Sequence, residues 1–219
     1  MAKALTEKIA LGSNYAKGDR ASDVARFNEL IDKLGKVRVL DIGCKHDSMK
    51  FPGSVGLDIL KSEGVDVVHD LEKFPYPFKD GHFNMIIANH VFEHINDLPP
   101  VMEEMYRILG SGGFLIVRTP FYMHHGAYDD PTHIRRFTLK TMDFFSIDSK
   151  WKLWGNDARF RIVHKKLFFG GEAINPGRFL LRYSERLYEK YLQHWFPGTC
   201  LLWVLEAAER EPKVKKVRK

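Results

Sequence analysis

The 219-residue chain has little cysteine and no long apolar segment. Its two cysteines, Cys44 and Cys200, lie far apart in the sequence, which excludes a disulfide framework and a zinc motif built on paired cysteines. No apolar run approaches the roughly 20 residues of a membrane-spanning helix. The opening residues, MAKALTEKIA, lack the apolar core of a signal peptide. From these absences we expect a protein of the reducing cytoplasm without a transmembrane segment.

A basic surface is also missing from most of the chain. The formal net charge is +6, but the segment 212–219 holds five lysine and arginine residues and no acid. Subtracting those five charges from six leaves the remainder at +1. The sequence therefore predicts a basic, disordered tail rather than a basic body, so nucleic acid is an open but disfavoured partner.

The rest of the chain predicts one α/β domain over 21–211, after an N-terminal extension over 1–20. Five runs that are apolar on both faces predict parallel strands at 37–42, 54–59, 65–70, 83–90 and 112–120. Helical spacing predicts helices over 21–35, 97–110 (with Asp97 as its cap) and 138–145. Two strand-like runs at 159–171 and 199–210 predict a final antiparallel pair, interrupted by a helical insertion over 172–197. This pattern predicts a single Rossmann-like, doubly wound domain whose sheet is mostly parallel.

Polar residues and a glycine follow the ends of the predicted parallel strands. The carboxyl ends of parallel strands meet at one edge of a sheet, where α/β proteins bind their ligands. The sequence therefore predicts a ligand site at this edge. The residues at the five strand ends are Asp41, Gly43, Asp58, Asp70, Asn89, His90, Thr119 and Pro120.

The connections after the first two predicted strands are short. Residues 45–53, which include Pro52 and Gly53, separate the first strand from the second, whereas a parallel crossover normally takes a dozen or more residues. Only a turn or a short helical fragment fits there. A dinucleotide cofactor needs a glycine-rich turn that leads into a helix, so the missing helix disfavours that class of ligand.

The segments VLDIGC, FEHI and RILGSGG resemble those of class I S-adenosylmethionine-dependent methyltransferases of the type 11-like group. The resemblance runs from about Val37 to Phe145. It is most specific in HDLEKFPYPFKDGHFNMIIANHVFEHINDL followed by MEEMYRILGSGGFLIVRTP. It implies that S-adenosylmethionine binds across the first four strand ends, with S-adenosylhomocysteine as the product.

The chemistry of the donor suits the residues at these strand ends. A carboxylate at Asp58 suits two ribose hydroxyls, and apolar side chains with one polar partner suit an adenine ring. Close backbone approach at Gly43 and a nearby acid suit the methionine end of the donor. Related sequences commonly have glycine where Lys45 stands, so donor affinity depends on the backbone there. The predicted cofactor-binding residues are Asp41, Gly43, Cys44, Lys45, Asp58, Ile59, Asp70, Leu71, Asn89 and His90.

Methyl transfer to a hydroxyl or amine needs alignment of the acceptor and removal of a proton. His133, His90 and His94 are the candidate bases. The segment 121–138 follows the fifth strand and should overhang the methyl group, either as an acceptor site or as a structural turn. Its candidate acceptor-binding residues are His124, His125, Asp130, Arg135 and Arg136.

Metal binding is an alternative function for the segment NHVFEHI. His90, Glu93 and His94 are spaced to share one face if the segment is helical, and some relatives carry a metal on a comparable pattern. We favour a structural role for Glu93 and His94, and we expect no metal.

The sequence favours methyl transfer to an oxygen or nitrogen of a small-molecule or saccharide-like acceptor. Two alternatives stay open: an RNA methyltransferase that uses the basic tail, and a donor-binding or inactive scaffold that acts through protein interaction. The aromatic-rich segment 178–196 predicts packing on the domain, with a lid, a homodimer face or a membrane-surface stripe as alternatives.

Overall fold

The computed structural model describes residues 32, 34, 37–45, 50–51, 53–149, 158–170, 176–181 and 184–209. The predicted N-terminal extension and the basic tail lie outside these residues, as does the predicted helix over 21–35 apart from Asp32 and Leu34. The division of the chain at residues 20 and 211 therefore stays a prediction.

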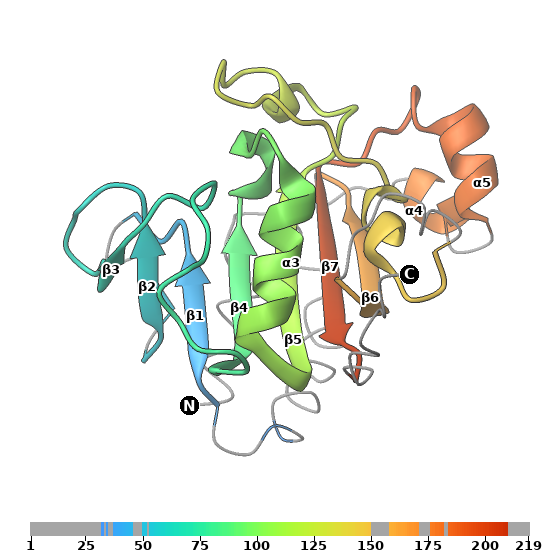
Figure 1. The fold of residues 1–219 in the computed structure, drawn as a ribbon. Coiled ribbons are helices and arrows are strands. Elements are labelled where there is room, and N and C mark those ends of the chain that lie inside the picture. Colours follow the sequence, from blue (N-terminus) through green and yellow to red (C-terminus); the bar gives the residue numbers. More distant parts are fainter. Residues whose placement is uncertain are drawn as a thin grey trace, which may run out of the picture.

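Within the described residues, seven strands form one sheet in the order β3-β2-β1-β4-β5-β7-β6 (Figure 1). The first five are parallel, and β7 runs antiparallel to both β5 and β6. The fold class is therefore confirmed: a Rossmann-like, mostly parallel sheet with a C-terminal antiparallel pair. The strands are β1 (Val39–Ile42), β2 (Val55–Asp58), β3 (Val67–Val68), β4 (Phe83–Asn89), β5 (Leu109–Pro120), β6 (Phe160–Phe168) and β7 (Cys200–Ala207).

Helix α3 (Leu98–Ile108) covers one face of the sheet between β4 and β5 (Figure 1). Its apolar stripe is fully buried because leucine, valine, methionine and isoleucine recur at helical spacing: Leu98, Val101, Met102, Met105 and Ile108. Asp97 is the N-cap residue, as predicted, but its side chain makes no capping hydrogen bond, because Pro99 and Pro100 at the next positions have no N–H to donate. The Glu72 carboxylate instead accepts the backbone N–H groups of Asn96 and Asp97 at the helix start.

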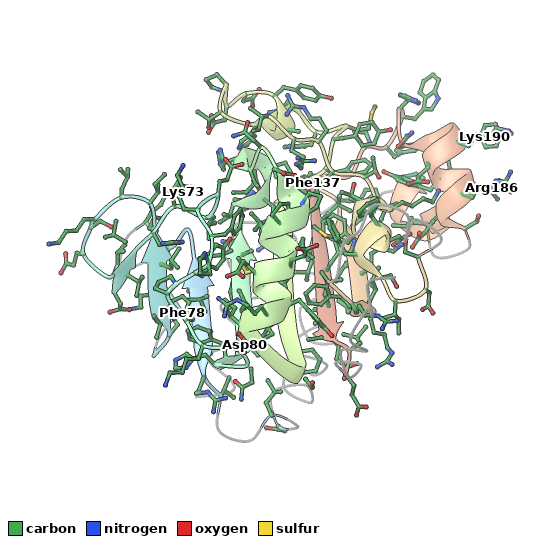
Figure 2. All side chains as sticks on the ribbon, viewed as in Figure 1. Lys73, Phe78, Asp80, Phe137, Arg186 and Lys190 are labelled. Carbon is green, nitrogen blue, oxygen red and sulfur yellow. The ribbon has the colours of Figure 1, made fainter. Side chains whose placement is uncertain are left out.

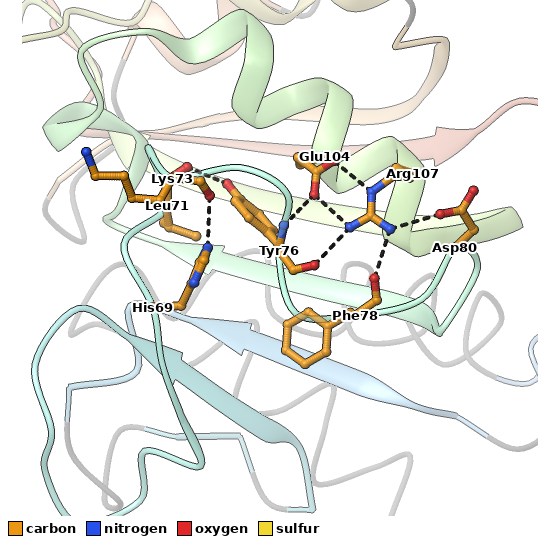
Figure 3. A network of polar contacts seen from close by, with 8 residues as sticks. All are labelled: His69, Leu71, Lys73, Tyr76, Phe78, Asp80, Glu104 and Arg107. Atoms are coloured by element: carbon orange, nitrogen blue, oxygen red, sulfur yellow. Dashed lines mark hydrogen bonds and ion pairs between the residues drawn. The ribbon is translucent and has the colours of Figure 1, made fainter.

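The loop between β3 and β4 is fastened to α3 by the network in Figure 3. The Arg107 guanidinium donates to both oxygens of Glu104, to Asp80 Oδ1, and to the carbonyls of Tyr76 and Phe78. Glu104 also accepts the Tyr76 N–H at 2.8 Å. These contacts hold the loop between β3 and β4 against α3.

The C-terminal hairpin contains the predicted helical insertion, in several short pieces. Helix α4 (Pro176–Leu181) is followed by α5 (Glu185–Leu187), which continues as a π-helical turn (Tyr188–Leu192). Tyr188 is buried, whereas the large apolar side chains of Leu187, Tyr191 and Trp195 are exposed. Arg186 and Lys190 lie on the outer side of this insertion (Figure 2). The insertion therefore packs on the domain, as predicted, through one face only.

Segment 138–145 forms a 3₁₀ helix (Thr141–Phe145) where an α-helix was predicted. At its start the Thr138 backbone N–H donates to the Thr141 hydroxyl at 2.9 Å, a contact of the kind found at helix N-termini. Among the described residues, the helices all fall short of the length and apolar character needed to cross a membrane.

Candidate active site

The carboxyl edge of the parallel strands is the upper edge of the sheet in Figure 1. Two groups of loops lie there. The first group follows β1, β2 and β3; we call it the donor half. The second follows β4 and β5 and meets the start of β7; we call it the acceptor half. The two halves are built differently, and each contains residues predicted from the sequence.

Gly43 forms the turn after β1, with φ +65°, and its N–H donates to the Leu57 carbonyl at 2.8 Å. A Cβ at this position would lie 2.4 Å from Val91 Cγ2, so another residue would clash with the loop after β4. The glycine is therefore required by the chain's own packing. The prediction that it admits the methionine end of a donor stays a prediction.

Asp58 ends β2 and is 6 % exposed. Its Oδ2 accepts the Lys45 N–H and its Oδ1 accepts the Leu60 N–H, both at 3.0 Å. Each carboxylate oxygen keeps a lone pair for a further donor, as two ribose hydroxyls would require. Lys45 has φ +48°, a left-handed conformation that favours glycine, and its carbonyl accepts a hydrogen bond from the Ser62 hydroxyl.

Asp41 is buried and its Oδ2 accepts the Phe51 N–H at 2.6 Å. The carboxylate thus holds the end of the short crossover, and Phe51 packs on the face of the sheet opposite α3. Burial, together with the charges of Asp41 and Asp58, raises the pKa of the Cys44 thiol to about 11. Cys44 is therefore a neutral, buried group beside the two carboxylates.

The residues predicted to surround an adenine lie on either side of β3. Ile59, directly after Asp58, exposes 60 % of its surface, and the next residue, Leu60, which was not among the predicted residues, exposes 71 %. Leu71 is buried, and Asp70 Oδ1 accepts the Glu72 N–H at 2.9 Å. Two large apolar side chains in water beside the Asp58 carboxylate offer a surface on which an aromatic ring could pack.

The acceptor half begins at Asn89, the last residue of β4. Asn89 Oδ1 is buried and has no hydrogen-bond partner among the described residues. The next residue, His90, has φ +56°, and its N–H donates to the Arg118 carbonyl at 2.9 Å. This backbone conformation turns the chain sharply away from the sheet and into the 3₁₀ helix Phe92–His94.

His90 lies between Glu93 and Cys200. Its Nδ1 donates to Glu93 Oε1 at 3.0 Å. Burial lowers the pKa of His90, but the hydrogen bonds to Cys200 and Glu93 outweigh it and raise the pKa to about 9. A ring that keeps its proton at neutral pH is a poor general base, which counts against that predicted role for His90.

The structure divides the predicted group of His90, Glu93 and His94. The segment is a 3₁₀ helix rather than an α-helix, so His94 turns toward the loop after β5. There it contacts His133 edge to face, with ring centroids 4.8 Å apart, and its Nδ1 lies 2.9 Å from the Thr132 hydroxyl. The histidine that lies beside His94 is therefore His133, which sequence spacing alone did not indicate.

The loop 121–138 is held by backbone contacts. Ile134 and Arg135 donate their N–H groups to the Glu93 carbonyl. The Arg135 guanidinium donates to the carbonyls of Ile95 and Asn96, and Arg136 donates to the His133 carbonyl at 2.6 Å. Within the described residues neither arginine has a carboxylate partner. Their predicted role toward an acceptor stays open.

Two of the candidate acceptor residues lie at the tip of this loop. His124 Nδ1 accepts the Gly126 N–H, and burial and the neighbouring His125 lower the pKa of His124. His125 pairs with Asp129 at 2.5 Å, with 76 % of its side chain exposed. Asp130 accepts the Thr132 N–H and hydroxyl. Of these residues, only Asp130 lies near the His94–His133 contact.

Sequence reasoning missed Arg118 and Cys200 in this half. Arg118 is buried in β5, donates to Cys200 Sγ at 3.3 Å and stacks over the Phe168 ring. The signal available was topological: the last strand is antiparallel, so its first residue lies at the edge where the parallel strands end. Cys200 pairs with Pro120 in the ladder for this reason.

Comparisons with known proteins agree on one family. A family model described as a methyltransferase domain matches residues 15–168, well over half of the chain. The ubiquinone/menaquinone biosynthesis C-methyltransferase UbiE of Neisseria meningitidis is 31 % identical over 131 residues, 53 % of this chain and 50 % of that protein. UbiE of Psychromonas ingrahamii is 29 % identical over 126 residues, 50 % of this chain and 47 % of that protein. The chain thus spans about half the length of the curated relatives it matches.

Solved structures share the fold at low identity. A SAM-dependent methyltransferase from Archaeoglobus fulgidus has a TM-score of 0.56 at 20 % identity, over 83 % of this chain and 91 % of that one. The [4+2]-cyclase SpnF has a TM-score of 0.51 at 15 % identity, over 94 % of each chain. Because proteins named for different reactions share this fold, the fold alone does not name a reaction.

Proposed function

Because the chain belongs to the family of methyltransferase domains, we propose that it transfers the methyl group of S-adenosylmethionine to a small-molecule acceptor. The donor supplies an electrophilic methyl group on a sulfonium. The protein must bind it, orient it and hold the acceptor in line with the methyl group. The proposal assigns these two tasks to the two halves of the sheet edge.

Two observations support a fit between the donor half and S-adenosylmethionine, and a third concerns Asn89, the first residue of the acceptor half. Asp58 keeps lone pairs on both oxygens, which suits two ribose hydroxyls. Ile59 and Leu60 offer exposed apolar surface for an adenine. Asn89 Oδ1, without a partner among the described residues, suits a donor group such as the ammonium of the methionine end.

The acceptor half carries the proposed specificity. Its side chains include buried polar atoms that lack partners among the described residues: Asn89 Oδ1, Glu93 Oε2, Thr119 Oγ1 and His133 Nδ1. Buried polar groups without partners are rare in folded proteins, and a bound molecule with donors and acceptors would satisfy them. These unsatisfied atoms, on β4, β5 and the segments that follow them, are the observation that carries the proposal. It favours an acceptor with hydroxyl, amine or carbonyl groups, methylated at oxygen or nitrogen.

A titration of donor binding tests the first task. We expect S-adenosylmethionine and S-adenosylhomocysteine each to bind in calorimetry, and Asp58→Ala to weaken both by about 100-fold, since two hydroxyls lose a charged partner. Asp97→Ala is the matched control, because Asp97 is exposed and its side chain caps nothing. A melting curve of each variant separates lost binding from lost folding, and Asp58→Asn keeps one acceptor oxygen if the alanine variant fails to fold. No binding to the wild-type chain at millimolar donor would overturn the proposal.

A screen with radiolabelled methyl donor tests the second task. Phenols, sugars, amines, quinone precursors and RNA are offered to the full chain, and label is followed into each. Label in a hydroxyl or amine is the expected result. Label on carbon would instead follow the chemistry for which the UbiE relatives are named. Label in RNA alone would overturn the small-molecule acceptor.

A further inference from the structure

One cluster of side chains at the sheet edge has the composition of a metal site. Glu93, His94 and His133 each place a ligand atom so that all three atoms lie within 4.8 Å of one another. The first two come from the 3₁₀ helix after β4 and the third from the loop after β5. Backbone hydrogen bonds from Ile134 and Arg135 to the Glu93 carbonyl hold the two segments together. The arrangement therefore does not depend on the side chains alone.

The Glu93 carboxylate is 1 % exposed. Its Oε1 accepts from His90, but within the described part of the chain its buried Oε2 has no partner. A buried carboxylate oxygen without a partner costs free energy unless a cation or donor reaches it. Glu93 Oε2 is thus an unsatisfied ligand atom aimed into the cluster.

The neighbours of His94 select its proton position. Its Nδ1 contacts both the hydroxyl and the carbonyl oxygen of Thr132, at 2.9 and 3.3 Å. A carbonyl only accepts, and the Thr132 hydroxyl gives its own hydrogen to Asp130 Oδ1 at 2.6 Å. Nδ1 of the neutral ring must therefore carry the proton, which leaves Nε2 with a free lone pair. A hydrogen bond to the non-ligating nitrogen is how metal-binding histidines are usually oriented.

His133 lies close to the same aspartate, without a hydrogen bond to it. Its Nε2 lies 3.9 Å from Asp130 Oδ2, while its buried Nδ1 has no partner among the described residues. Asp130 therefore lies behind both histidines, directly at His133 and through Thr132 at His94. This leaves Glu93 Oε2, His94 Nε2 and His133 Nδ1 as the three atoms without other partners in the described structure.

We propose that Glu93, His94 and His133 bind a divalent transition-metal cation, with Asp130 and Thr132 as the residues that position His94. Two imidazoles and one carboxylate favour Zn²⁺, Mn²⁺, Fe²⁺ or Co²⁺ over Mg²⁺ and Ca²⁺, which prefer oxygen ligands. Three protein ligands leave coordination positions for water or for an oxygen of the acceptor. The sequence led us to expect no metal, and the alternative it offered contained His90. In the structure His133, and not His90, is the second histidine of the proposed ligand set, because His90 is turned toward Glu93 Oε1 and Cys200.

Metal binding to the full chain tests this proposal without any measurement of methyl transfer. The chain is freed of metal with a chelator, and Zn²⁺, Mn²⁺ or Mg²⁺ is added alone in calorimetry and in equilibrium dialysis with elemental analysis. We expect one equivalent of Zn²⁺ or Mn²⁺ and much weaker Mg²⁺. His94→Ala, His133→Ala and Glu93→Gln should each weaken binding by about 100-fold, and Asp130→Asn by about 10-fold.

His125→Ala is the matched control, since it removes an exposed histidine from the same loop without touching the cluster. Co²⁺ absorption spectra add a signature of nitrogen ligation, and melting curves show which variants are folded. The proposal fails if the wild-type chain binds less than one equivalent, or if the three ligand variants bind as tightly as His125→Ala. Either result leaves the proposed methyl transfer intact, because the donor titration is independent of the metal.

Discussion

The two halves of the sheet edge satisfy their polar groups in opposite ways. In the donor half Asp41, Asp58 and Asp70 each accept at least one backbone N–H. In the acceptor half Asn89, Glu93, Thr119 and His133 each bury an atom without a partner among the described residues. The donor half is thus largely completed by its own backbone. The acceptor half is a set of groups that a ligand would complete.

The short connections explain this difference. A full crossover after β1 would end the turn with a helix N-terminus, whose free N–H groups bind a ligand directly. With only residues 45–53 available, the carboxylates of Asp41 and Asp58 accept the N–H groups of Phe51 and Lys45 instead. Carboxylates that read as ligand-binding residues in the sequence therefore also hold the loops in place. In the acceptor half, Asp130 and Arg135 also hold the loop backbone, but Glu93 and His133 each keep a buried atom without a partner among the described residues.

The largest effect should follow from breaking the network that holds the loop between β3 and β4 to α3. Arg107→Met removes the hydrogen bonds to Tyr76, Phe78 and Asp80 and leaves Glu104 without its cation (Figure 3). We expect a loss of about 3 kcal/mol in the free energy of unfolding at pH 7. The measurement is urea unfolding followed by circular dichroism.

The pH dependence of that loss provides its control. Burial raises the pKa of Glu104, but the Arg107 and Tyr76 hydrogen bonds outweigh it and lower the pKa below its usual 4.5. A lowered pKa contributes stability above the unfolded value, and that contribution is lost as pH falls through the folded value. The difference between wild type and Arg107→Met should therefore shrink below about pH 4.5. A difference that is constant across this range would show that Glu104 plays no part.

The sequence predicted the strands and the residues that stand at their ends, because both depend on local pattern. The apolar runs found every parallel strand, and Asp58 stands at its predicted strand end. It could not predict the cluster around Glu93, since His133 reaches it through a loop whose path depends on hydrogen bonds to the Glu93 carbonyl. The helical spacing of His90, Glu93 and His94 was misleading because the segment forms a 3₁₀ helix. Asp97 stands at the N-cap as predicted, but Pro99 and Pro100 offer its side chain no N–H to accept.

A smaller effect, of opposite sign, should come from the acceptor half. Thr119 is fully buried and its hydroxyl has no partner in the described structure. Thr119→Val keeps the shape and removes the unsatisfied group, so we expect a gain of about 1 kcal/mol in the free energy of unfolding. Thr199→Val is the matched control: its hydroxyl donates to the Phe168 carbonyl at 3.2 Å, and its loss should cost about 1 kcal/mol. Equal losses in both variants would contradict the contrast between satisfied and unsatisfied groups.

The smallest effect should come from Lys45→Gly in the donor half, where neighbouring side chains hold the backbone. Asp58 and Ser62 hold the N–H and the carbonyl of this residue, so its φ of +48° is imposed from both sides. Lys45→Gly removes a left-handed strain of roughly 1 kcal/mol and adds a similar entropy to the unfolded chain. We expect the free energy of unfolding to stay within about 0.5 kcal/mol of wild type. Lys45→Val, β-branched in the same conformation, should lose roughly 1–2 kcal/mol.

Donor affinity of the same variants decides what the residue does. If only the backbone of Lys45 matters, Lys45→Gly should bind S-adenosylmethionine as wild type does, within about threefold by calorimetry. Lys45→Val should bind it more weakly, because the N–H held by Asp58 would shift. An increase of about tenfold or more in Lys45→Gly would mean that the side chain obstructs the donor. In that case the donor half does not yet have its best shape for the donor, and the two halves would differ less than their hydrogen bonds suggest.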